Sequence, residues 1–320
     1  MWHERIAIIG GTGFIGGNLA CELARGRRRI RIITRRRERD RRLLVIPTLE
    51  LVEADVHSTA SLSAALTGCD AVVNMTGVLH SRARPGQGFR DVHAELPRKI
   101  AEAARFNRIT RMLHMSALGA AADAPSEYLR SKAAGEQALH AESAEGLAIT
   151  SFRPSVVFGP QDGFLNLFAR LLALSPGVFP LACADARFAP VYVGDVVNAF
   201  THALADDATA GQCYELCGPR SYTLRELVAY TARVIGLKRR IIALPDVLAR
   251  LQARVLGQLP GAPFTMDNYL SMQVDSVCSQ NGFARLGITP RSLESIAPGY
   301  LAGSRKERLY SELRTSAGRE

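Results

Sequence analysis

The sequence is poor in aromatic residues and lacks long apolar runs. It holds a single tryptophan, aromatic residues make up 7% of it, and charges such as Arg170 and Asp195 interrupt every stretch that approaches the roughly 18 residues of a membrane span. The apolar run Ile6–Ile9 begins almost at the first residue, so we expect neither a signal nor a transit peptide. A hydrophobic share of 47% with 22% charged residues excludes wholesale disorder, collagen-like repeats and coiled coil. We therefore expect a folded cytoplasmic protein of about two domains.

Metal and redox motifs are also lacking. The six cysteines are scattered, and the only close pair, Cys213 and Cys217, has three residues between its members, which fits neither zinc nor a redox CxxC. Most cysteines are therefore expected to be buried free thiols of a reducing compartment. His80 and His93 have no metal-ligand partner at a useful spacing, so we assign them no role and expect no metal site.

An excess of basic residues outside one segment is lacking, because acidic residues nearly balance them there, although the net charge is +10. Eleven arginines lie between Arg25 and Arg42 against Glu38 and Asp40, a local charge of +9, which leaves +1 for the other 302 residues. A nucleic-acid-binding protein is recognised by a basic face or stripe and by its binding motifs. We therefore expect no nucleic-acid partner.

Short β-rich apolar runs alternate with longer helical patterns through the first half of the chain. This rhythm is typical of βαβ units and a parallel sheet. Strands are expected at 5–9, 30–34, 49–53, 71–75, 111–115 and 148–152, and helices at 14–25, 58–66, 94–107, 128–142, 195–204, 224–235, 246–259 and 292–301. The fold predicted is an α/β doubly wound parallel sheet of the Rossmann, NAD(P)-binding type with a smaller, mostly helical C-terminal lobe.

Breaks such as Gly159-Pro160 and Pro176-Gly177 suggest that this lobe is interleaved with the sheet. We assign residues 1–155 and about 186–205 to the dinucleotide-binding domain. Residues 156–185 and 206–302 form the lobe that would meet a substrate or partner, and 303–320 form a charged tail.

The first strand leads into Gly10-Gly11-Thr12-Gly13-Phe14-Ile15-Gly16, with glycines at Gly10, Gly13 and Gly16. Glycines at these places permit a tight turn, close approach of the backbone to a pyrophosphate, and close packing of helix on strand. The phosphate then meets free N–H groups at the positive end of the helix. Because a strand precedes the motif and a helix follows it, we expect Gly10, Thr12, Gly13, Phe14, Ile15 and Gly16 to bind a dinucleotide.

The second strand ends in Arg35-Arg36-Arg37 instead of the acidic residue that would hold a ribose 2′-hydroxyl. Guanidinium groups bind a 2′-phosphate bidentately, so NADP(H) is favoured, with NAD(H) as the alternative, and Arg35 and Arg36 are the expected ligands. The other arginines form a solvated loop or meet an acidic partner or anionic lipid head groups.

Two further strand ends supply polar or small residues. Asp55-Val56 follows the third strand, where a carboxylate can accept from the adenine amino group, and Thr76-Gly77 follows the fourth, where backbone would lie along the cofactor. The carboxyl ends of neighbouring parallel strands meet at one edge, so both pairs are expected in the cofactor site, although either could be a turn.

Tyr128 and Lys132 form a YxxxK spacing that places both on one helix face. An ammonium beside a phenol favours the phenolate, so Tyr128 is the expected proton donor or acceptor, while Lys132 also holds the nicotinamide ribose.

Together these motifs resemble the short-chain dehydrogenase/reductase superfamily, in its extended and atypical branches, which include the NAD-dependent epimerases and dehydratases. The segments 116–119, 132–136, 153–160 and 190–197 agree with it. The resemblance implies a serine or threonine hydroxyl beside the catalytic tyrosine, but Leu118 stands there. Ser116 and Ser126 are the available substitutes, and we choose Ser116 as the third catalytic candidate.

A narrower resemblance, in the Ser-Ala-Leu-Gly turn and in segments 267–270 and 286–290, is to nucleotide-binding accessory subunits of respiratory complex I (alpha subcomplex subunit nine) and their bacterial relatives. Two functions follow. One is an NADP(H)-dependent oxidoreductase, epimerase or dehydratase acting on an unidentified small molecule. The other is a protein that holds NADPH as a structural or sensing cofactor and docks to a respiratory or membrane-associated partner, at the inner face of the membrane.

The segment Val247–Leu256 is amphipathic, with Val247, Leu248, Leu251 and Val255 on one face and two arginines on another. Such a helix either lies at a membrane surface or covers the core of its lobe, and the second is the more common arrangement.

Overall fold

The computed structural model describes residues 3–37, 43–79, 86, 88–142, 146–259 and 262–302. The chain forms two compact units. Unit 1 comprises residues up to 154 together with 194–216 and 278–289, and unit 2 comprises residues 155–193, 217–277 and those from 290 on.

Unit 1 is built on a seven-stranded parallel sheet with the strand order β11-β6-β5-β4-β1-β2-β3. Its strands are β1 (Arg5–Ile9), β2 (Arg29–Thr34), β3 (Leu49–Glu53), β4 (Ala71–Asn74), β5 (Arg111–Met115), β6 (Ala148–Pro154) and β11 (Cys213–Leu216). The central strands are buried on both faces, which explains their nearly continuous apolar sequences. The doubly wound fold predicted from the sequence is confirmed.

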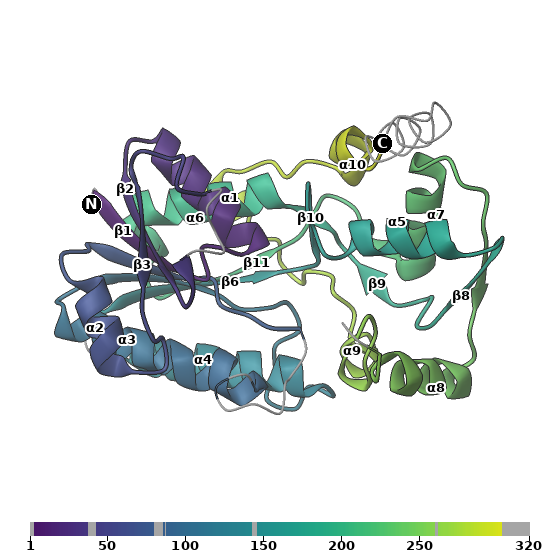
Figure 1. The fold of residues 1–320 in the computed structure, drawn as a ribbon, viewed down its shortest axis with the longest axis horizontal. Coiled ribbons are helices and arrows are strands. Elements are labelled where there is room, and N and C mark those ends of the chain that lie inside the picture. Colours follow the sequence, from purple (N-terminus) through teal and green to yellow (C-terminus); the bar gives the residue numbers. More distant parts are fainter. Residues whose placement is uncertain are drawn as a thin grey trace, which may run out of the picture. The chain divides into compact units, whose positions relative to one another are not determined.

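Helices cover both faces of this sheet (Figure 1). They are α1 (Phe14–Arg25), α2 (Thr59–Leu66), the π-helical turn η2 (Asp91–Glu95), α3 (Leu96–Phe106), α4 (Glu127–Glu142) and α6 (Val193–Ala205), with short 3-10 turns η4 (Asp207–Thr209) and η5 (Ala284–Leu286). Leu62, Ile100 and Leu139 from α2, α3 and α4 share one core with Ala7 and Ile9 of β1. On the other face, Phe152 of β6 contacts Phe200 of α6 with ring centroids 4.2 Å apart.

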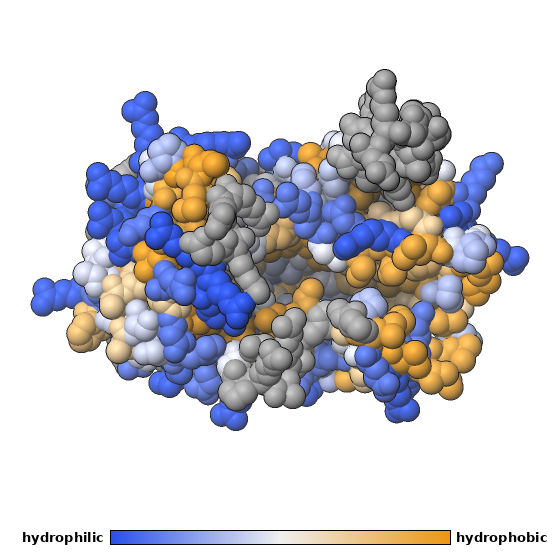
Figure 2. Space-filling model, viewed as in Figure 1, coloured by the Kyte–Doolittle hydropathy of each residue, from blue (hydrophilic) through white to orange (hydrophobic). Residues whose placement is uncertain are grey.

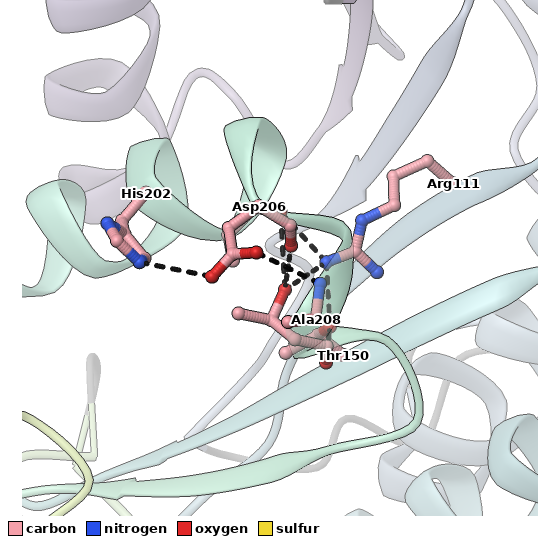
Figure 3. A network of polar contacts seen from close by, with 7 residues as sticks. Arg111, Thr150, His202, Asp206 and Ala208 are labelled. Atoms are coloured by element: carbon pink, nitrogen blue, oxygen red, sulfur yellow. Dashed lines mark hydrogen bonds and ion pairs between the residues drawn. The ribbon is translucent and has the colours of Figure 1, made fainter. Parts of the chain in front are cut away.

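A buried arginine ties α6 to the sheet at the amino end of β5 (Figure 3). The Arg111 guanidinium donates to Ala148 O at 3.0 Å and Thr150 Oγ1 at 2.8 Å on β6, and to Ala203 O at 2.9 Å in the last turn of α6. It also donates to Thr209 Oγ1 at 2.7 Å. A cation at the C-terminal end of a helix complements the helix dipole, so Arg111 both bonds and neutralises the end of α6.

Unit 2 combines short strands with helices. Its strands are β7 (Val157–Phe158), β8 (Val178–Leu181), β9 (Arg187–Phe188), β10 (Val191–Tyr192), β12 (Tyr222–Thr223) and β13 (Arg240–Ala243), paired as β7 with β10, β8 with β13 and β9 with β12. The helices are α5 (Leu165–Leu174), α7 (Leu224–Val234), α8 (Asp246–Leu256), α9 (Met266–Ser271) and α10 (Leu293–Leu301). Phe158, Leu172, Leu227 and Leu293 lie in its main core.

The unit boundaries differ from those expected at three places. Residues 206–216 belong to unit 1 because β11 pairs with β6 as a seventh strand. Residues 278–289 join it because Gly282 N–H donates to Glu215 O at 2.7 Å. Residues 186–193 belong to unit 2, where Phe188 pairs with Tyr222. Strand β11 escapes detection because it is a short edge strand in which only Tyr214 and Leu216 are buried. The tail 303–320 lies outside the described residues.

Four cysteines are free, as expected for most of them, but only Cys69 of these is buried. Cys217 and Cys278 are disulfide-bonded and are not among the free thiols. Within the described ranges, no helix is both long and apolar enough to cross a bilayer.

Candidate active site

The turn after β1 brings the glycine motif against the end of β4. Gly10 has φ +82°, and a Cβ atom there would lie 2.8 Å from the carbonyl carbon and oxygen of Met75. A Cβ atom at Gly16 would lie 2.4 Å from Gly10 O, so the first turn of α1 packs directly on the loop. Strands β1 and β4 are parallel neighbours, but the strands that follow β1 are added on one side of this pair and those that follow β4 on the other. The order of strands therefore reverses here, at the switch point where such folds bind ligands.

The amino end of α1 is open to an anion. Gly13 is the N-cap residue and has no side chain to bond the first N–H groups, and the first turn, which contains Phe14 and Ile15, holds no acidic residue. Thr12 is half-buried and lies between the buried Gly11 and the exposed Gly13. An uncapped helix end and the helix dipole therefore suit a pyrophosphate, and the individual ligands stay a prediction.

Arg35 and Arg36 directly follow β2, and both are exposed. The backbone N–H of Arg36 donates to Thr34 Oγ1 at 3.4 Å. This bond does not involve the side chain of Arg36, which is exposed to solvent. Arg37 N–H donates to Glu53 Oε2 at 3.2 Å. Residues 38–42, which carry three more of the arginines, lie outside the described residues. Arg35 and Arg36 thus lie at the carboxyl edge of the sheet, where the sequence predicts a phosphate.

Asp55 and Val56 follow β3 and differ in environment. Asp55 is exposed, and its Oδ1 accepts from His57 N–H at 2.9 Å, so the carboxylate shapes a turn and keeps Oδ2 for another partner. Val56 is buried in the core shared by α2 and α3. Only the backbone of Val56 could therefore contact a cofactor, and both residues remain predictions.

The end of β4 is held by a buried asparagine. Asn74 Oδ1 accepts from Thr76 N–H at 3.0 Å and from Thr76 Oγ1 at 2.6 Å. The Asn74 amide lies 3.2 Å from His114 Nδ1 on β5. Since an amide nitrogen donates, His114 Nδ1 accepts, and burial lowers the pKa of His114 well below its usual value. These bonds fix the position of the backbone at Thr76 and Gly77, next to the glycine loop.

Tyr128 and Lys132 come from the first two turns of α4. Lys132 is almost completely buried, and its Nζ donates to Met115 O at 3.0 Å and Thr76 O at 3.2 Å. Burial lowers the pKa of Lys132 to about 8, partly opposed by Glu136 one turn further along. A Cβ atom at Gly77 would lie 3.5 Å from Nζ, so the lysine amino group sits beside the switch-point backbone.

His93, to which the sequence assigns no role, lies inside this site. Its Nε2 accepts from Val78 N–H at 3.0 Å, and its Nδ1 lies 2.9 Å from Ser131 Oγ, which donates to Tyr128 O at 2.8 Å. These bonds require a neutral ring protonated on Nδ1. Burial, with Lys132, lowers the pKa of His93 to about 2. The ring meets the Tyr128 ring edge-on, with centroids 5.3 Å apart.

A glycine on α4 makes room for His93. A Cβ atom at Gly135 would lie 1.7 Å from His93 O, so α4 and the π-helical turn η2 touch backbone to backbone. π-helical turns are rare and are frequent at functional sites. Sequence patterns did not indicate His93, because the spacing of a lone histidine does not show which loop it bonds. A π turn at 91–95, where an uninterrupted helix was expected from 94, is the structural reason for its position.

The two serine hydroxyl groups considered as partners of Tyr128 lie against other groups of α4. Ser126 caps α4, with its Oγ accepting from Leu129 N–H at 3.2 Å. Ser116 Oγ is buried and has no hydrogen-bond partner among the described residues, yet it is close enough to Glu136 to help lower that carboxyl's pKa. Leu118 is buried. Ser116 therefore faces the Glu136 side of α4, and its catalytic assignment stays a prediction.

Glu136 itself is held by an arginine. Arg153 Nε lies 3.0 Å from both Glu136 carboxylate oxygens, and Nη2 makes a further short contact with Oε1. Although burial raises the pKa of Glu136, the bonds from Arg153 bring it below its usual value. The paired carboxylate thus stays ionised one turn from Lys132. Across the described residues no group of three or more histidines, cysteines or acidic residues is arranged to hold a metal. His80 lies outside them.

The glycine cradle, the open helix end and the Tyr-Lys pair at the switch point together define a dinucleotide-binding protein of the Rossmann type. This chain belongs to the NAD dependent epimerase/dehydratase family, whose model matches residues 6–217. Its cofactor is a nicotinamide dinucleotide.

Three comparisons show the range of its relatives. The chain is 30% identical to the mitochondrial NADH dehydrogenase [ubiquinone] 1 alpha subcomplex subunit 9 of Mus musculus, over 90% of this chain and 77% of that protein. It is 33% identical to the ceramide reductase of Caulobacter vibrioides, over 75% of this chain and 74% of that one. The structure of dTDP-glucose 4,6-dehydratase from Streptomyces venezuelae, with NAD and DAU bound, superposes with a TM-score of 0.70 at 20% identity, covering 97% and 98% of the two chains. The last similarity concerns the fold.

Proposed function

We propose that this protein is an oxidoreductase-type member of its family that uses NADP(H) in preference to NAD(H). The proposal rests on Tyr128 and Lys132, which lie one turn apart on α4 with the lysine amino group bonded to Thr76 O at the switch point. Two exposed arginines, Arg35 and Arg36, directly follow β2 in place of an acidic residue, and this supports the preference for a 2′-phosphate.

In this proposal the bound nicotinamide supplies or accepts the hydride. Tyr128 gives a proton to, or takes one from, the oxygen of the reacting carbon. Lys132 stabilises the phenolate and holds the nicotinamide ribose. The neutral His93 ring supports Tyr128 from the side and takes no proton itself, because both of its nitrogens are already bonded. The substrate is unidentified. The name of the Caulobacter relative makes ceramide-type lipids the first to test, either their secondary alcohol with NADP⁺ or the corresponding ketone with NADPH.

The experiment begins by purifying the protein without added nucleotide, denaturing it, and identifying and quantifying what is released. An enzyme exchanges NADPH freely and turns over, and Tyr128→Phe abolishes turnover while leaving NADPH affinity within about twofold, because the phenol oxygen acts in the chemical step. Turnover that survives Tyr128→Phe would contradict the proposal. Tightly retained NAD(H) would contradict the assignment of Arg35 and Arg36.

A second candidate function is favoured by Leu118. With an apolar side chain in place of the family's hydroxyl and Ser126 used as a helix cap, substrate polarisation lacks its usual donor. We propose as the alternative that the protein holds NADPH as a structural or sensing cofactor and associates with a respiratory complex, as the name of the mouse relative suggests. Stoichiometric NADPH that survives purification and resists oxidation by carbonyl acceptors would favour this alternative. The cytoplasmic location expected from the sequence, with or without attachment to the inner face of the membrane, also remains a prediction.

A further inference from the structure

Helix α8 presents its smallest side chains to the rest of unit 2 and its largest to solvent. Its buried residues are Ala249 and Ala253, which pack with Tyr269 of α9. The exposed large apolar residues are Val247, Leu248, Leu251 and Val255 on the helix and Leu259 just beyond it, with 47–76% of each exposed. The expectation that this face covers the core of the lobe is therefore wrong.

The exposed residues form one continuous stripe. At about 100° per residue, the four on the helix occupy about 100° of its circumference, which is the width of a stripe that normally faces a core. Apolar atoms gather over α8 in Figure 2, at the place where Figure 1 labels the helix. Single exposed hydrophobic residues are ordinary, but a contiguous stripe of this size marks an interaction surface.

Exposed apolar residues also lie on the neighbouring pair of strands, β8 and β13. Gln252 of α8 donates to Pro180 O of β8 at 3.4 Å, which places the helix beside this pair. Val178 of β8 and Ile242 of β13 are 48% and 42% exposed. The apolar surface of unit 2 is thus broader than the helix alone, and it has no apolar cover among the described residues.

The segment that contains β13 and α8 is rich in positive charge. The segment 238–254 carries five basic side chains, Lys238, Arg239, Arg240, Arg250 and Arg254, against the single acidic residue Asp246. Arg250 is paired with Asp246 at 2.8 Å, which leaves the other four charges in excess. Arg254 is exposed and lies about 20° around the helix from Val247, at the border of the stripe. Long arginine stems can lie along an apolar surface while the charged head reaches outward.

We propose that the α8 face, defined as the five exposed apolar residues with Arg254, docks on the surface of an anionic lipid bilayer. An apolar stripe beside an excess of basic charge is what a helix lying in the membrane interface requires. A second copy of the same face is an unfavourable partner, because its four excess positive charges would repel the four on the first copy. The tail 303–320 has five basic and three acidic side chains, so its charge is unfavourable as well. This inference does not depend on the proposed function, because docking needs no cofactor turnover.

The test is sedimentation of the full-length protein with vesicles of phosphatidylcholine alone or mixed with phosphatidylglycerol. We expect binding to the mixed vesicles, weakened by added salt, and at least about tenfold weaker binding for the double variant Leu251→Glu/Val255→Glu, because the apolar area and the local charge are both changed. Phe106→Glu is the matched control, because Phe106 is 81% exposed on unit 1 and should leave vesicle binding unchanged.

A second variant separates a loss of vesicle binding from a loss of the fold. Val247→Ser changes the most exposed side chain of the stripe, whose removal leaves the core untouched, and should weaken binding by at least about threefold with an unchanged melting curve. The proposal is overturned if neither vesicle binds, if neutral vesicles bind equally well, or if the double variant binds as the wild type does. A dimer in light scattering that the double variant abolishes would assign the face to a second copy instead.

Discussion

Two buried cations, Arg111 at the amino end of the parallel sheet and Lys132 at its carboxyl end, have no carboxylate in direct contact among the described residues, yet their surroundings differ. At the amino end, Arg111 spreads its guanidinium over four oxygen acceptors from β6, α6 and the loop beyond. At the carboxyl end, Lys132 bonds two backbone carbonyls. An arginine keeps its proton, so the first end serves stability, whereas a lysine whose pKa is near neutrality can take part in chemistry.

The same contrast extends to the neighbouring groups. At the amino end, Thr150 and Thr209 each accept from Arg111 and donate onward to a carbonyl, so the hydroxyls are saturated. At the carboxyl end, the α1 N-terminus is uncapped and Arg35 and Arg36 are exposed. Groups left open to a ligand thus lie at the carboxyl end, beside groups such as Lys132 that are bonded within the protein.

Replacing the amino-end cation should have the largest effect on stability. Arg111→Met leaves two buried hydroxyls and two carbonyls without their donor, so we expect a loss of about 3 kcal/mol in the free energy of unfolding. Urea titration measures this loss, and NADPH affinity should stay within about twofold. Arg29→Met, at the exposed amino end of β2, is the control and should cost less than about 1 kcal/mol. Equal losses for the two variants would remove the contrast between the ends.

Lys132 should make the stability of the unliganded protein depend on pH. Its pKa is about 8 in the folded protein against 10.5 ordinarily, so between these values the unfolded chain binds more protons and stability rises with pH. The gain across this window is at most about 3 kcal/mol. Urea unfolding of wild type and Lys132→Met at several pH values tests this. The difference between their free energies of unfolding should increase with pH across the window. Parallel curves would show that Lys132 is ionised alike in both states.

His93, which is buried and neutral, should make the stability of the protein depend on pH in the acid range. Because the pKa of His93 falls from 6.5 to about 2 on folding, stability should decrease as pH falls below 6.5, by up to about 1.4 kcal/mol per pH unit. His93→Gln should reduce this slope between about pH 6.5 and about pH 5, measured by urea midpoints. His202→Gln at the amino end, where the ring is partly exposed, is the control. An unchanged slope in His93→Gln would show that His93 is not held neutral.

The smallest expected effect concerns the exposed arginines. Arg35→Ala/Arg36→Ala should weaken NADPH binding about tenfold by removing charge-assisted bonds to the 2′-phosphate, while NADH binding changes little. Fluorescence titration with both nucleotides measures the ratio, and Arg37→Ala is the neighbouring control. Equal weakening for NADPH and NADH would mean that these side chains do not recognise the 2′-phosphate.

Local patterns determined much of the first unit. Continuous apolar runs such as Ile6–Ile9 and Ala71–Val73 marked central strands, because strands buried on both faces need no alternation. Glycine spacing at Gly10 and Gly16 marked the cofactor turn, because those positions admit no Cβ atom. The YxxxK spacing placed Tyr128 and Lys132 on one face for the same local reason. These features follow from backbone periodicity, which a sequence displays directly.

Other features were decided only by tertiary structure. The roles of His93 and Ser126 depend on which N–H group each side chain meets, and β11 becomes a strand only because β6 offers it an edge. The amphipathic pattern of Val247–Leu256 was visible in the sequence, but its orientation was not. A hydrophobic stripe shows that a helix has an apolar face, whereas the packing of Ala249 and Ala253 decides that this face points to solvent, because burial depends on contacts between residues distant in the chain.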